Sequence, residues 1–228
     1  MFQVYIGYDA KESVAYHTLA HSILRRSSIP VSIAPVMQSQ LNGLYTRPRG
    51  PTESTEFSLT RFLVPALSGY RGWSMFMDCD MLCRADIAEL AALRDQAADK
   101  AVLVCQHDYV PKTKRKFLDQ VQTKYERKNW SSLMLFNNER CRSLSPQYVN
   151  SATGLDLHRF KWMDDASIGG LPLEWNWLVG EYDANPAAKI VHYTLGGPWF
   201  DEYRDCHYAD EWLEENRRAN SAANPVPA

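Results

Sequence analysis

The sequence predicts an α/β protein with a mostly parallel central sheet and helices on both of its faces. Short apolar segments that suit buried strands, such as residues 2–7 and 31–36, alternate with longer segments whose apolar residues recur at helical spacing. Strand–helix–strand units of this kind build parallel sheets. A chain of 228 residues with 45% hydrophobic content can bury one large core. We therefore expect a single domain over residues 1–218, followed by a polar, flexible tail over residues 219–228.

The beginning of the chain gives one such unit. Residues 2–7, FQVYIG, are rich in β-branched and aromatic residues and end at a glycine, as a short buried strand does. Residues 12–26 are predicted to form a helix with Asp9 ahead of it as a cap, and residues 31–36, VSIAPV, a second strand. The helix is indicated by apolar residues at every fourth position, namely Ala15, Leu19 and Ile23.

The alternation continues after a long polar segment. Residues 38–55 contain Pro48, Gly50 and Pro51 and show no apolar period, so they predict a loop, and loops of this length in a compact domain are often functional. The other predicted elements are a helix over residues 56–67 interrupted by Pro65, a strand over 73–77, a helix over 86–99, strands over 101–105 and 131–137, a turn over 169–177 and a strand over 188–193.

Composition and charge argue against several classes of protein. The net charge of −2 is unlike that of proteins that bind nucleic acid through a strongly basic surface. The five cysteines are scattered, with no CxxC pair, which suits reduced thiols in a cytoplasm. The chain does not open with a basic segment followed by a long apolar one, and no stretch approaches the roughly 18 apolar residues of a membrane span. We therefore expect a cytoplasmic protein with no signal peptide, no transmembrane segment and no nucleic-acid partner.

Two aspartates mark the first candidate site. Asp78 and Asp80 directly follow the apolar segment 73–77, and in alternating α/β sheets ligands bind beyond the carboxyl ends of the strands. Side chains two positions apart share a face of extended chain, so the two carboxylates can reach one cation. Hard oxygen ligands of this type suit Mg²⁺ or Mn²⁺ that bridges a diphosphate. The alternative is a pair of loop-capping aspartates beside a helix that starts at Asp86.

A histidine far along the chain is the second candidate. The predicted strand over 188–193 contains His192 and leads into Gly196 and Gly197, where the backbone can approach a ligand closely. A neutral imidazole can supply a third metal ligand beside the two aspartates. A lone histidine after a strand is also commonly a structural residue, and the sequence leaves both interpretations open.

The order and spacing of several motifs make the sequence similar to a known family. It resembles the retaining glycosyltransferases of family eight, the glycogenin and lipopolysaccharide galactosyltransferase group, as a distant member. The resemblance implies the GT-A fold, a single Rossmann-like domain. The segments that carry it are IGYDAKES (6–13), TRFLVP (60–65), MDCDM (77–81), WSSLMLFN (130–137), LPLEWN (171–176) and HYTLGGPW (192–199).

This resemblance implies a metal-dependent hexosyltransferase. Such an enzyme moves a sugar from a nucleotide-sugar, here a UDP-sugar, to a hydroxyl of a glycan or another acceptor, with retention of the anomeric configuration. Asp78, Asp80 and His192 would hold Mn²⁺ or Mg²⁺, and Asp164 and Asp165 would be the catalytic groups beside the reacting sugar carbon. The residues that would bind the nucleotide-sugar are Tyr8 and Asp9 at the uracil base, and Arg61, Asp78, Ser131, Ser132, Asn176, Gly196 and Trp199.

Two other classes of function stay open from the sequence alone. A sugar nucleotidyltransferase uses similar substrates on a similar sheet, but it would be expected to open with a glycine-rich, basic phosphate loop, which GYDAKESVAY (7–16) lacks. A non-catalytic module that binds a nucleotide-sugar would not need the metal. The segment 111–128 contains seven basic and two acidic residues, which indicates either a solvated helix face or a surface that receives an anionic acceptor.

Overall fold

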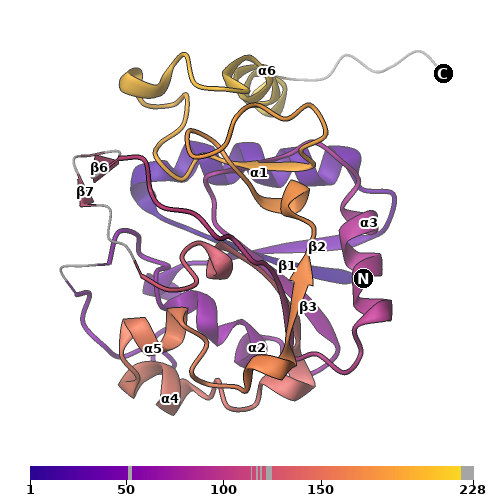
Figure 1. The fold of residues 1–228 in the computed structure, drawn as a ribbon, viewed down its shortest axis with the longest axis vertical. Helices are drawn as coiled ribbons and strands as arrows, with labels where there is room; N and C mark the ends of the chain where they lie inside the picture. Colours follow the sequence, from indigo (N-terminus) through magenta and orange to yellow (C-terminus); the bar gives the residue numbers. More distant parts are fainter. Residues whose placement is uncertain (51–52, 114, 117, 119, 122–124, 222–228) are drawn as a thin grey trace.

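Six strands form the central sheet of the computed structural model, in the order β2-β1-β3-β8-β5-β9 (Figure 1). The structure describes residues 1–50, 53–113, 115–116, 118, 120–121 and 125–221. The strands of this sheet are β1 (Phe2–Gly7), β2 (Val31–Val36), β3 (Trp73–Met77), β5 (Val102–Cys105), β8 (Leu133–Asn137) and β9 (Ile168–Leu171).

Most strands of this sheet run in one direction. β2 and β3 are parallel partners of β1, and β9 is a parallel partner of β5. β8 lies between β3 and β5 and is antiparallel to both. This arrangement confirms the predicted mostly parallel α/β sheet. The carboxyl ends of β1, β3 and β5 therefore lie at the same edge, and this is the edge where ligands bind in sheets of this type.

Helices cover both faces of the sheet. In Figure 1, α1 (Ser13–Arg26) lies above it, and α2 (Val64–Leu67), α4 (Pro146–Ser151) and α5 (Gly154–His158) lie below it. α3 (Ile87–Ala92) begins after Asp86, whose side chain accepts a hydrogen bond from the Ala88 backbone N–H at 2.9 Å. α6 (Ala209–Ala219) packs on α1. In the part of the chain that the structure describes, no helix has the length and apolar character needed to cross a membrane.

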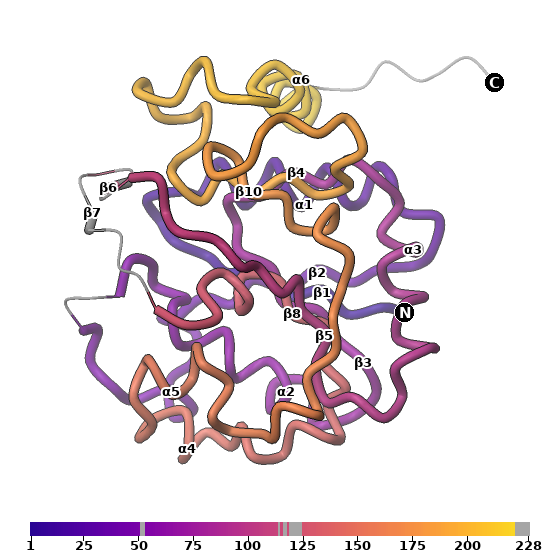
Figure 2. Tube along the Cα trace, in the orientation of Figure 1, coloured from indigo at the N-terminus to yellow at the C-terminus, as the bar shows by residue number. Residues whose placement is uncertain are grey.

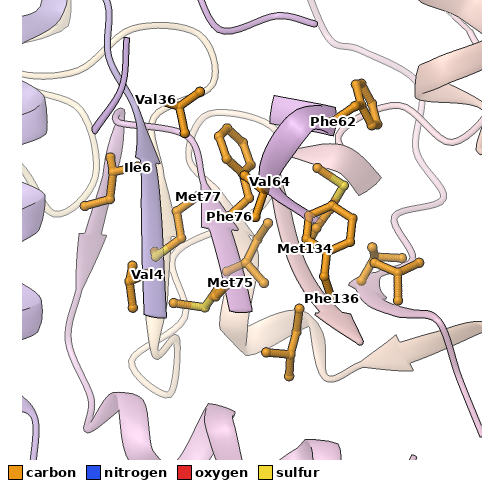
Figure 3. Packing of buried hydrophobic residues seen from close by; sticks show 14 of the residues in the cluster. Val4, Ile6, Val36, Phe62, Val64, Met75, Phe76, Met77, Met134 and Phe136 are labelled. Atoms are coloured by element: carbon orange, nitrogen blue, oxygen red, sulfur yellow. The ribbon is translucent and has the colours of Figure 1, made fainter. Parts of the chain in front are cut away.

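The main hydrophobic core surrounds the central strands. Its side chains come from β1, β3, β8 and the region of α2. The residues named in the next sentence are each at most 1% exposed. Figure 3 shows Val4, Ile6, Phe62, Val64, Met75, Phe76, Met77, Met134 and Phe136 at its centre. Apolar residues occur in consecutive positions along these strands because helices cover the sheet on both sides. The sheet is therefore a rigid base for the residues that follow its strands.

A second, smaller sheet continues from the first. It contains β10 (Trp177–Leu178), β11 (Ile190–His192) and β4 (Met81–Cys83), with β11 parallel to β10 and antiparallel to β4. The Cys83 backbone N–H donates to the hydroxyl of Ser22 on α1 at 3.1 Å, which joins this sheet to α1. A separate hairpin of β6 (Arg115–Lys116) and β7 (Gln120–Val121) lies at the left edge of the molecule in Figure 2.

The structure corrects several predicted elements. The segment 56–67 is helical only from residue 60, as a 3₁₀ turn (Thr60–Leu63) followed by α2. The predicted helix over 86–99 is α-helical only as far as Ala92 and then continues as a 3₁₀ turn (Leu93–Gln96). The turn predicted over 169–177 is wrong in its first part, which belongs to β9. A Cβ at Gly169 would clash with the side chain of Leu103, so glycine lets this edge strand pack closely on β5.

The end of the described chain holds a helix that the sequence pattern did not indicate. α6 buries Ala209, Trp212 and Glu215, so its buried face holds two apolar side chains and one carboxylate among mostly polar residues. The predicted tail over 219–228 starts at the last residue of α6, and residues 222–228 lie outside the described part of the chain.

Candidate functional site

The two aspartates lie where the chain passes from the central sheet to the smaller one. Asp78 and Asp80 occupy the connection between β3 and β4. The Asp78 backbone N–H donates to the Ser132 carbonyl, and the Tyr193 N–H donates to the Asp80 carbonyl, both at 2.8 Å. Cys79 between them is buried, and burial together with the surrounding carboxylates raises the pKa of its thiol.

β11 brings His192 to the same place. Its antiparallel pairing with β4 sets His192 opposite Met81, the residue after Asp80. The imidazole is buried, and its Nε2 lies 3.3 Å from Asp80 Oδ1. One ligand atom from each of Asp78, Asp80 and His192 lies within 4.8 Å of the others. The structure thus brings together the three residues that were predicted to hold a metal ion, and carboxylate and imidazole ligands both suit Mn²⁺.

Arg61 holds the first aspartate in place. Its side chain is 7% exposed, and its Nη1 lies 2.7 Å from Asp78 Oδ1. Nε donates to the carbonyls of Phe57 and Ser58 at 3.2 and 3.1 Å, and Nη1 donates to that of Ser131 at 2.9 Å. The guanidinium carbon lies 5.4 Å from the centroid of the Phe57 ring. These contacts fix the guanidinium, which in turn fixes the Asp78 carboxylate.

Asn176 orients the histidine. Its Nδ2 donates to Ser132 Oγ at 2.8 Å, and the Ser132 hydroxyl donates to the Asn129 carbonyl at 2.7 Å. Because the Nδ2 atom of Asn176 donates to Ser132, the other amide atom, Oδ1, faces His192. Oδ1 accepts a hydrogen bond from the His192 Nδ1–H at 3.0 Å. His192 Nε2 is then the atom that faces Asp80. A nitrogen lone pair and a carboxylate oxygen this close together can coordinate the same metal ion.

Arg61, Asp78, Asp80 and His192 line a cavity of about 610 Å³, a size that suits a small-molecule ligand. Segments far apart in the sequence contribute to it, from residue 47 to residue 194. Six residues that were predicted to bind metal or nucleotide-sugar are among those that line it, namely Arg61, Asp78, Asp80, Ser131, Ser132 and His192. The structure therefore places the central part of the predicted site on one concave surface.

The long loop predicted over residues 38–55 supplies part of this lining. Its Arg47 and Gly50 line the cavity, while residues 51–52 lie outside the described part of the chain. Arg47 Nη1 donates to the carbonyls of Val149 and Ala152 at 3.0 and 2.7 Å. Arg47 therefore fastens this loop to the C-terminal end of α4.

The sequence did not indicate His158, which also lines the cavity. Its Nδ1 lies 2.7 Å from Ser131 Oγ. Burial and the neighbouring Arg61 lower the pKa of His158 to about 3, so the imidazole is neutral near neutral pH. With Ser131 and Ser132 it forms an uncharged polar wall beside the aspartates. No motif marks this histidine, because only the packing of α5 against Phe62 and Ser131 brings it to the cavity.

The remaining predicted site residues are not among the described residues that line the cavity: Tyr8, Asp9, Asn176, Gly196, Trp199, Asp164 and Asp165. Asn176 contacts the triad through His192. Asp9 is 2% exposed and accepts backbone hydrogen bonds from Lys11 at 3.0 Å and from Glu56 at 3.1 Å. It therefore caps a short 3₁₀ turn (Ala10–Glu12) and not α1, the helix it was predicted to cap, and it also holds the segment that precedes Arg61.

Asp165 and Trp199 have other partners in this structure. Asp165 is 77% exposed, its Oδ1 lies 2.7 Å from Arg127 Nη2, and the hydrogen bond from Arg127 lowers the pKa of this carboxyl. The Trp199 ring packs on Trp212, with 5.0 Å between centroids, and a Cβ at Gly197 would clash with the Trp199 ring. The predicted binding and catalytic roles of these residues stay predictions.

Solved structures with the same fold include several enzymes described as glycosyltransferases. The bifunctional glycosyltransferase WbbM matches with a TM-score of 0.66 at 16% identity, over 94% of this chain and 49% of WbbM, so the chain spans about half of that protein. The galactosyltransferase LgtC in complex with donor and acceptor sugar analogs matches with a TM-score of 0.59 at 12% identity, over 97% of this chain and 98% of LgtC. GlyE of Streptococcus pneumoniae matches with a TM-score of 0.61 at 14% identity, over 95% and 61%. The fold is that of the GT-A glycosyltransferases.

At the level of sequence, no protein-family model matches the chain. Protein CDI of Arabidopsis thaliana is 52% identical to it over 229 residues, which cover 96% of this chain and 87% of that protein. Identity this high over nearly the whole chain requires common descent, and the protein accordingly belongs to the same family as Protein CDI.

Proposed function

We propose that this protein is a metal-dependent glycosyltransferase that moves a sugar from a UDP-sugar to a hydroxyl of a glycan or another acceptor, with retention of configuration. The observation that carries the proposal is the triad of Asp78, Asp80 and His192 on the wall of the cavity of about 610 Å³. The GT-A fold supports it, because the solved structures that share this fold include enzymes described as glycosyltransferases.

The residues of the triad fit a divalent cation. Two carboxylates and one imidazole, with ligand atoms within 4.8 Å of one another, would hold Mn²⁺ or Mg²⁺ and leave positions for substrate oxygens. When bound, such an ion would stabilise the negative charge that develops on the diphosphate leaving group. Arg61 compensates the charge of Asp78 from the protein side, and Asn176 keeps His192 Nε2 directed at Asp80.

The neighbouring wall suits the donor sugar. Ser131 and Ser132 present short hydroxyl side chains there, and the neutral imidazole of His158 contacts Ser131 at 2.7 Å. Groups of this type exchange hydrogen bonds with sugar hydroxyls without adding charge next to the diphosphate. We assign this wall to the donor sugar, and Asn176 to the support of both Ser132 and His192.

Other parts of the proposal rest on the family resemblance alone. Tyr8 and Asp9 would contact the uracil base, and Gly196 and Trp199 would border the diphosphate. Asp164 or Asp165 would stabilise the oxocarbenium-like sugar carbon or attack it covalently. A cytoplasmic location is also part of the proposal, and the five free cysteines agree with it.

Calorimetric titration of nucleotides tests the binding part of this proposal. UDP should bind the protein more tightly with Mn²⁺ than without it, and more tightly than GDP or ADP. Asp80→Asn removes one ligand charge with little change of shape and should abolish the Mn²⁺ effect, whereas Asp183→Asn, an exposed aspartate outside the cavity, should leave it intact. Equal binding of the three nucleotides, or a full Mn²⁺ effect in Asp80→Asn, contradicts the proposal.

The products separate a transferase from the alternatives. Incubated with a UDP-sugar and Mn²⁺ but no acceptor, a transferase should slowly release UDP and free sugar. A nucleotidyltransferase would instead consume or form pyrophosphate, and a binding module would leave the UDP-sugar unchanged. The NMR coupling constant of the anomeric proton in the first product then shows whether the configuration is retained.

A further inference from the structure

A second cavity of about 400 Å³ adjoins the first. The two share three lining residues, Tyr125, Lys128 and Arg159, so a molecule in one cavity can meet a molecule in the other at these side chains. The proposed function assigns only the first cavity, which contains the triad. A transferase needs a second substrate whose hydroxyl reaches the donor sugar, and the second cavity stands next to the donor cavity.

The charges of this second cavity favour an anion. Its cationic side chains are Arg127, Lys128 and Arg159, and its acidic ones are Asp108 and Glu126. Its histidine, His107, adds no charge, because burial and the nearby His192 lower the pKa of His107 to about 3. The described lining residues therefore carry three positive and two negative charges near neutral pH, and Arg127 has a further carboxylate partner, Asp165, outside the lining.

The three cationic side chains differ in their interaction partners. Arg127 donates to the Arg159 carbonyl at 2.9 Å, pairs with Asp165 at 2.7 Å and lies over the Trp130 ring, so it holds three segments together. Arg159 has a looser pair, since its Nε lies 3.7 Å from an oxygen of Glu126, whose side chain is 74% exposed. A long ion pair with an exposed carboxylate contributes little, so a better placed anion can displace it.

Aromatic rings complete the second cavity. Tyr109 and Tyr125 line it, and the Lys128 ammonium lies 5.9 Å from the centroid of the Tyr125 ring. The Tyr109 hydroxyl accepts a hydrogen bond from Asn129 Nδ2 at 2.8 Å, which fixes this ring. Aromatic faces beside polar groups suit the apolar face of a sugar ring.

We propose that the second cavity binds the acceptor, and that Arg159 and Lys128 recognise a carboxylate or phosphate group that the acceptor carries. This inference rests on the proposed function and specifies its second substrate as an anionic sugar. The two side chains lie where the cavities meet, so an anion bound to them would position the acceptor for reaction while its ring rests on Tyr109 and Tyr125. Among the described residues, the two ends of the basic segment 111–128 line this cavity, namely Pro111 and the run from Tyr125 to Lys128.

Calorimetric titration of three probes tests this inference. Glucuronate and glucose 6-phosphate carry the two possible anions on the same kind of ring, and glucose carries neither. Each probe is titrated into the full chain, with and without saturating UDP and Mn²⁺. Both anionic probes, or one of them, should bind about tenfold or more tightly than glucose, since hydrogen bonds to charged groups supply a gain of this order. Equal binding of the three probes, or binding of none at millimolar concentration, overturns the inference.

Three variants identify the cations. Arg159→Gln and Lys128→Gln should each weaken the anionic probe about tenfold and leave glucose binding unchanged. Arg204→Gln is the matched control, because Arg204 is an arginine that also pairs with an exposed carboxylate, Asp201 at 3.2 Å, and lines neither cavity. Unchanged probe binding in Arg159→Gln overturns the inference, and so does a parallel loss of UDP binding, which would assign these cations to the donor. If the unaltered protein does not bind UDP, the proposed function is contradicted. The titrations of the probes without UDP still test the second cavity in that case.

Discussion

Arg61 Nη1 lies 2.7 Å from Asp78 Oδ1, and this ion pair joins the protein core to the triad. Arg61 comes from the 3₁₀ turn before α2, whereas Asp78 follows β3. The guanidinium cannot lose its charge and has several donors in a fixed plane, so it satisfies the carbonyls around it and still faces the carboxylate. The pair therefore compensates one of the two negative charges of the triad from within the protein.

Replacement of Arg61 tests this charge compensation. Arg61→Met removes the charge and keeps much of the side-chain volume, so it should lower the free energy of unfolding by about 3 kcal/mol, because Asp78 loses its buried partner. Added Mn²⁺ should then raise the melting temperature of Arg61→Met more than that of the unaltered protein, since the cation takes over the compensation. The rise in melting temperature that Mn²⁺ causes in Arg61→Lys should be intermediate. One ammonium group cannot bind Asp78 and the carbonyls of Phe57 and Ser131 at the same time. Equal Mn²⁺ shifts in all three proteins, measured by thermal denaturation, would contradict this account.

A separate prediction concerns the role of Asn176 in orienting His192. Asn176→Leu removes the acceptor of His192 Nδ1 and the donor to Ser132 Oγ. Partners that orient a metal-binding histidine typically contribute about tenfold to hundredfold in metal affinity, so Mn²⁺ binding should weaken by that factor. Asn216→Leu is the matched control, because it also removes an amide hydrogen bond, to Thr18 at 2.8 Å, but far from the triad. Calorimetric titration with Mn²⁺ should show weaker binding in Asn176→Leu only. Equally weakened Mn²⁺ binding in both variants would refute the orienting role of Asn176.

The central sheet could be predicted because its strands are short and apolar in consecutive positions. β2 and β3 have the predicted bounds, residues 31–36 and 73–77. β4 and β9 could not be found in the same way, since β4 has three residues and β9 contains two glycines. Both are strands because of their neighbours, β11 and β5, and a sequence pattern contains no information about pairing of that kind.

The candidate site could be predicted in part for a related reason. Asp78, Asp80 and His192 follow or end strands, so strand patterns indicated where they would lie, and the structure brings them together. His158 could not be found, because its contact with Ser131 depends on how α5 packs. The ion pair of Arg127 with Asp165 also depends on packing, and it gives Asp165 a partner that the sequence did not suggest.

A catalytic role for Asp164 and Asp165 has its own test. If either carboxylate acts on the sugar carbon, Asp164→Asn or Asp165→Asn should lower the rate of UDP-sugar hydrolysis and transfer about a hundredfold or more, with UDP binding unchanged. Arg127→Gln then serves as a control for the ion pair, because it breaks the contact with Asp165 but leaves the carboxylate in place. Full transfer activity in both aspartate variants would exclude the role and leave the chemistry to groups that line the cavity.

Glu215 joins α6 to α1 and should make stability depend on pH. Its carboxylate is 2% exposed and lies 2.6 Å from His21 Nδ1, 3.0 Å from Arg25 Nη2 and 2.8 Å from Arg26 Nη2. Burial alone would raise the pKa of Glu215, but the hydrogen bonds and charges of Arg25, Arg26 and His21 outweigh it and lower the pKa to about 2. The folded state therefore binds the proton of this group less readily than the unfolded chain does.

The sign of the effect follows from this lowered pKa. The stabilisation is fully present above the ordinary glutamate pKa of about 4.5 and is lost as the pH falls toward about 2. Glu215→Gln should thus lower the free energy of unfolding by about 2 kcal/mol near neutral pH, and the difference from the unaltered protein should shrink as the pH falls through this range. Glu214→Gln changes the neighbouring glutamate, which pairs with Arg217 and Arg218 on the exposed side of α6, and should leave stability nearly unchanged. Urea denaturation at a series of pH values measures both variants. A pH-independent difference, or an equal effect of the two substitutions, would show that the contact between α1 and α6 does not depend on the Glu215 charge.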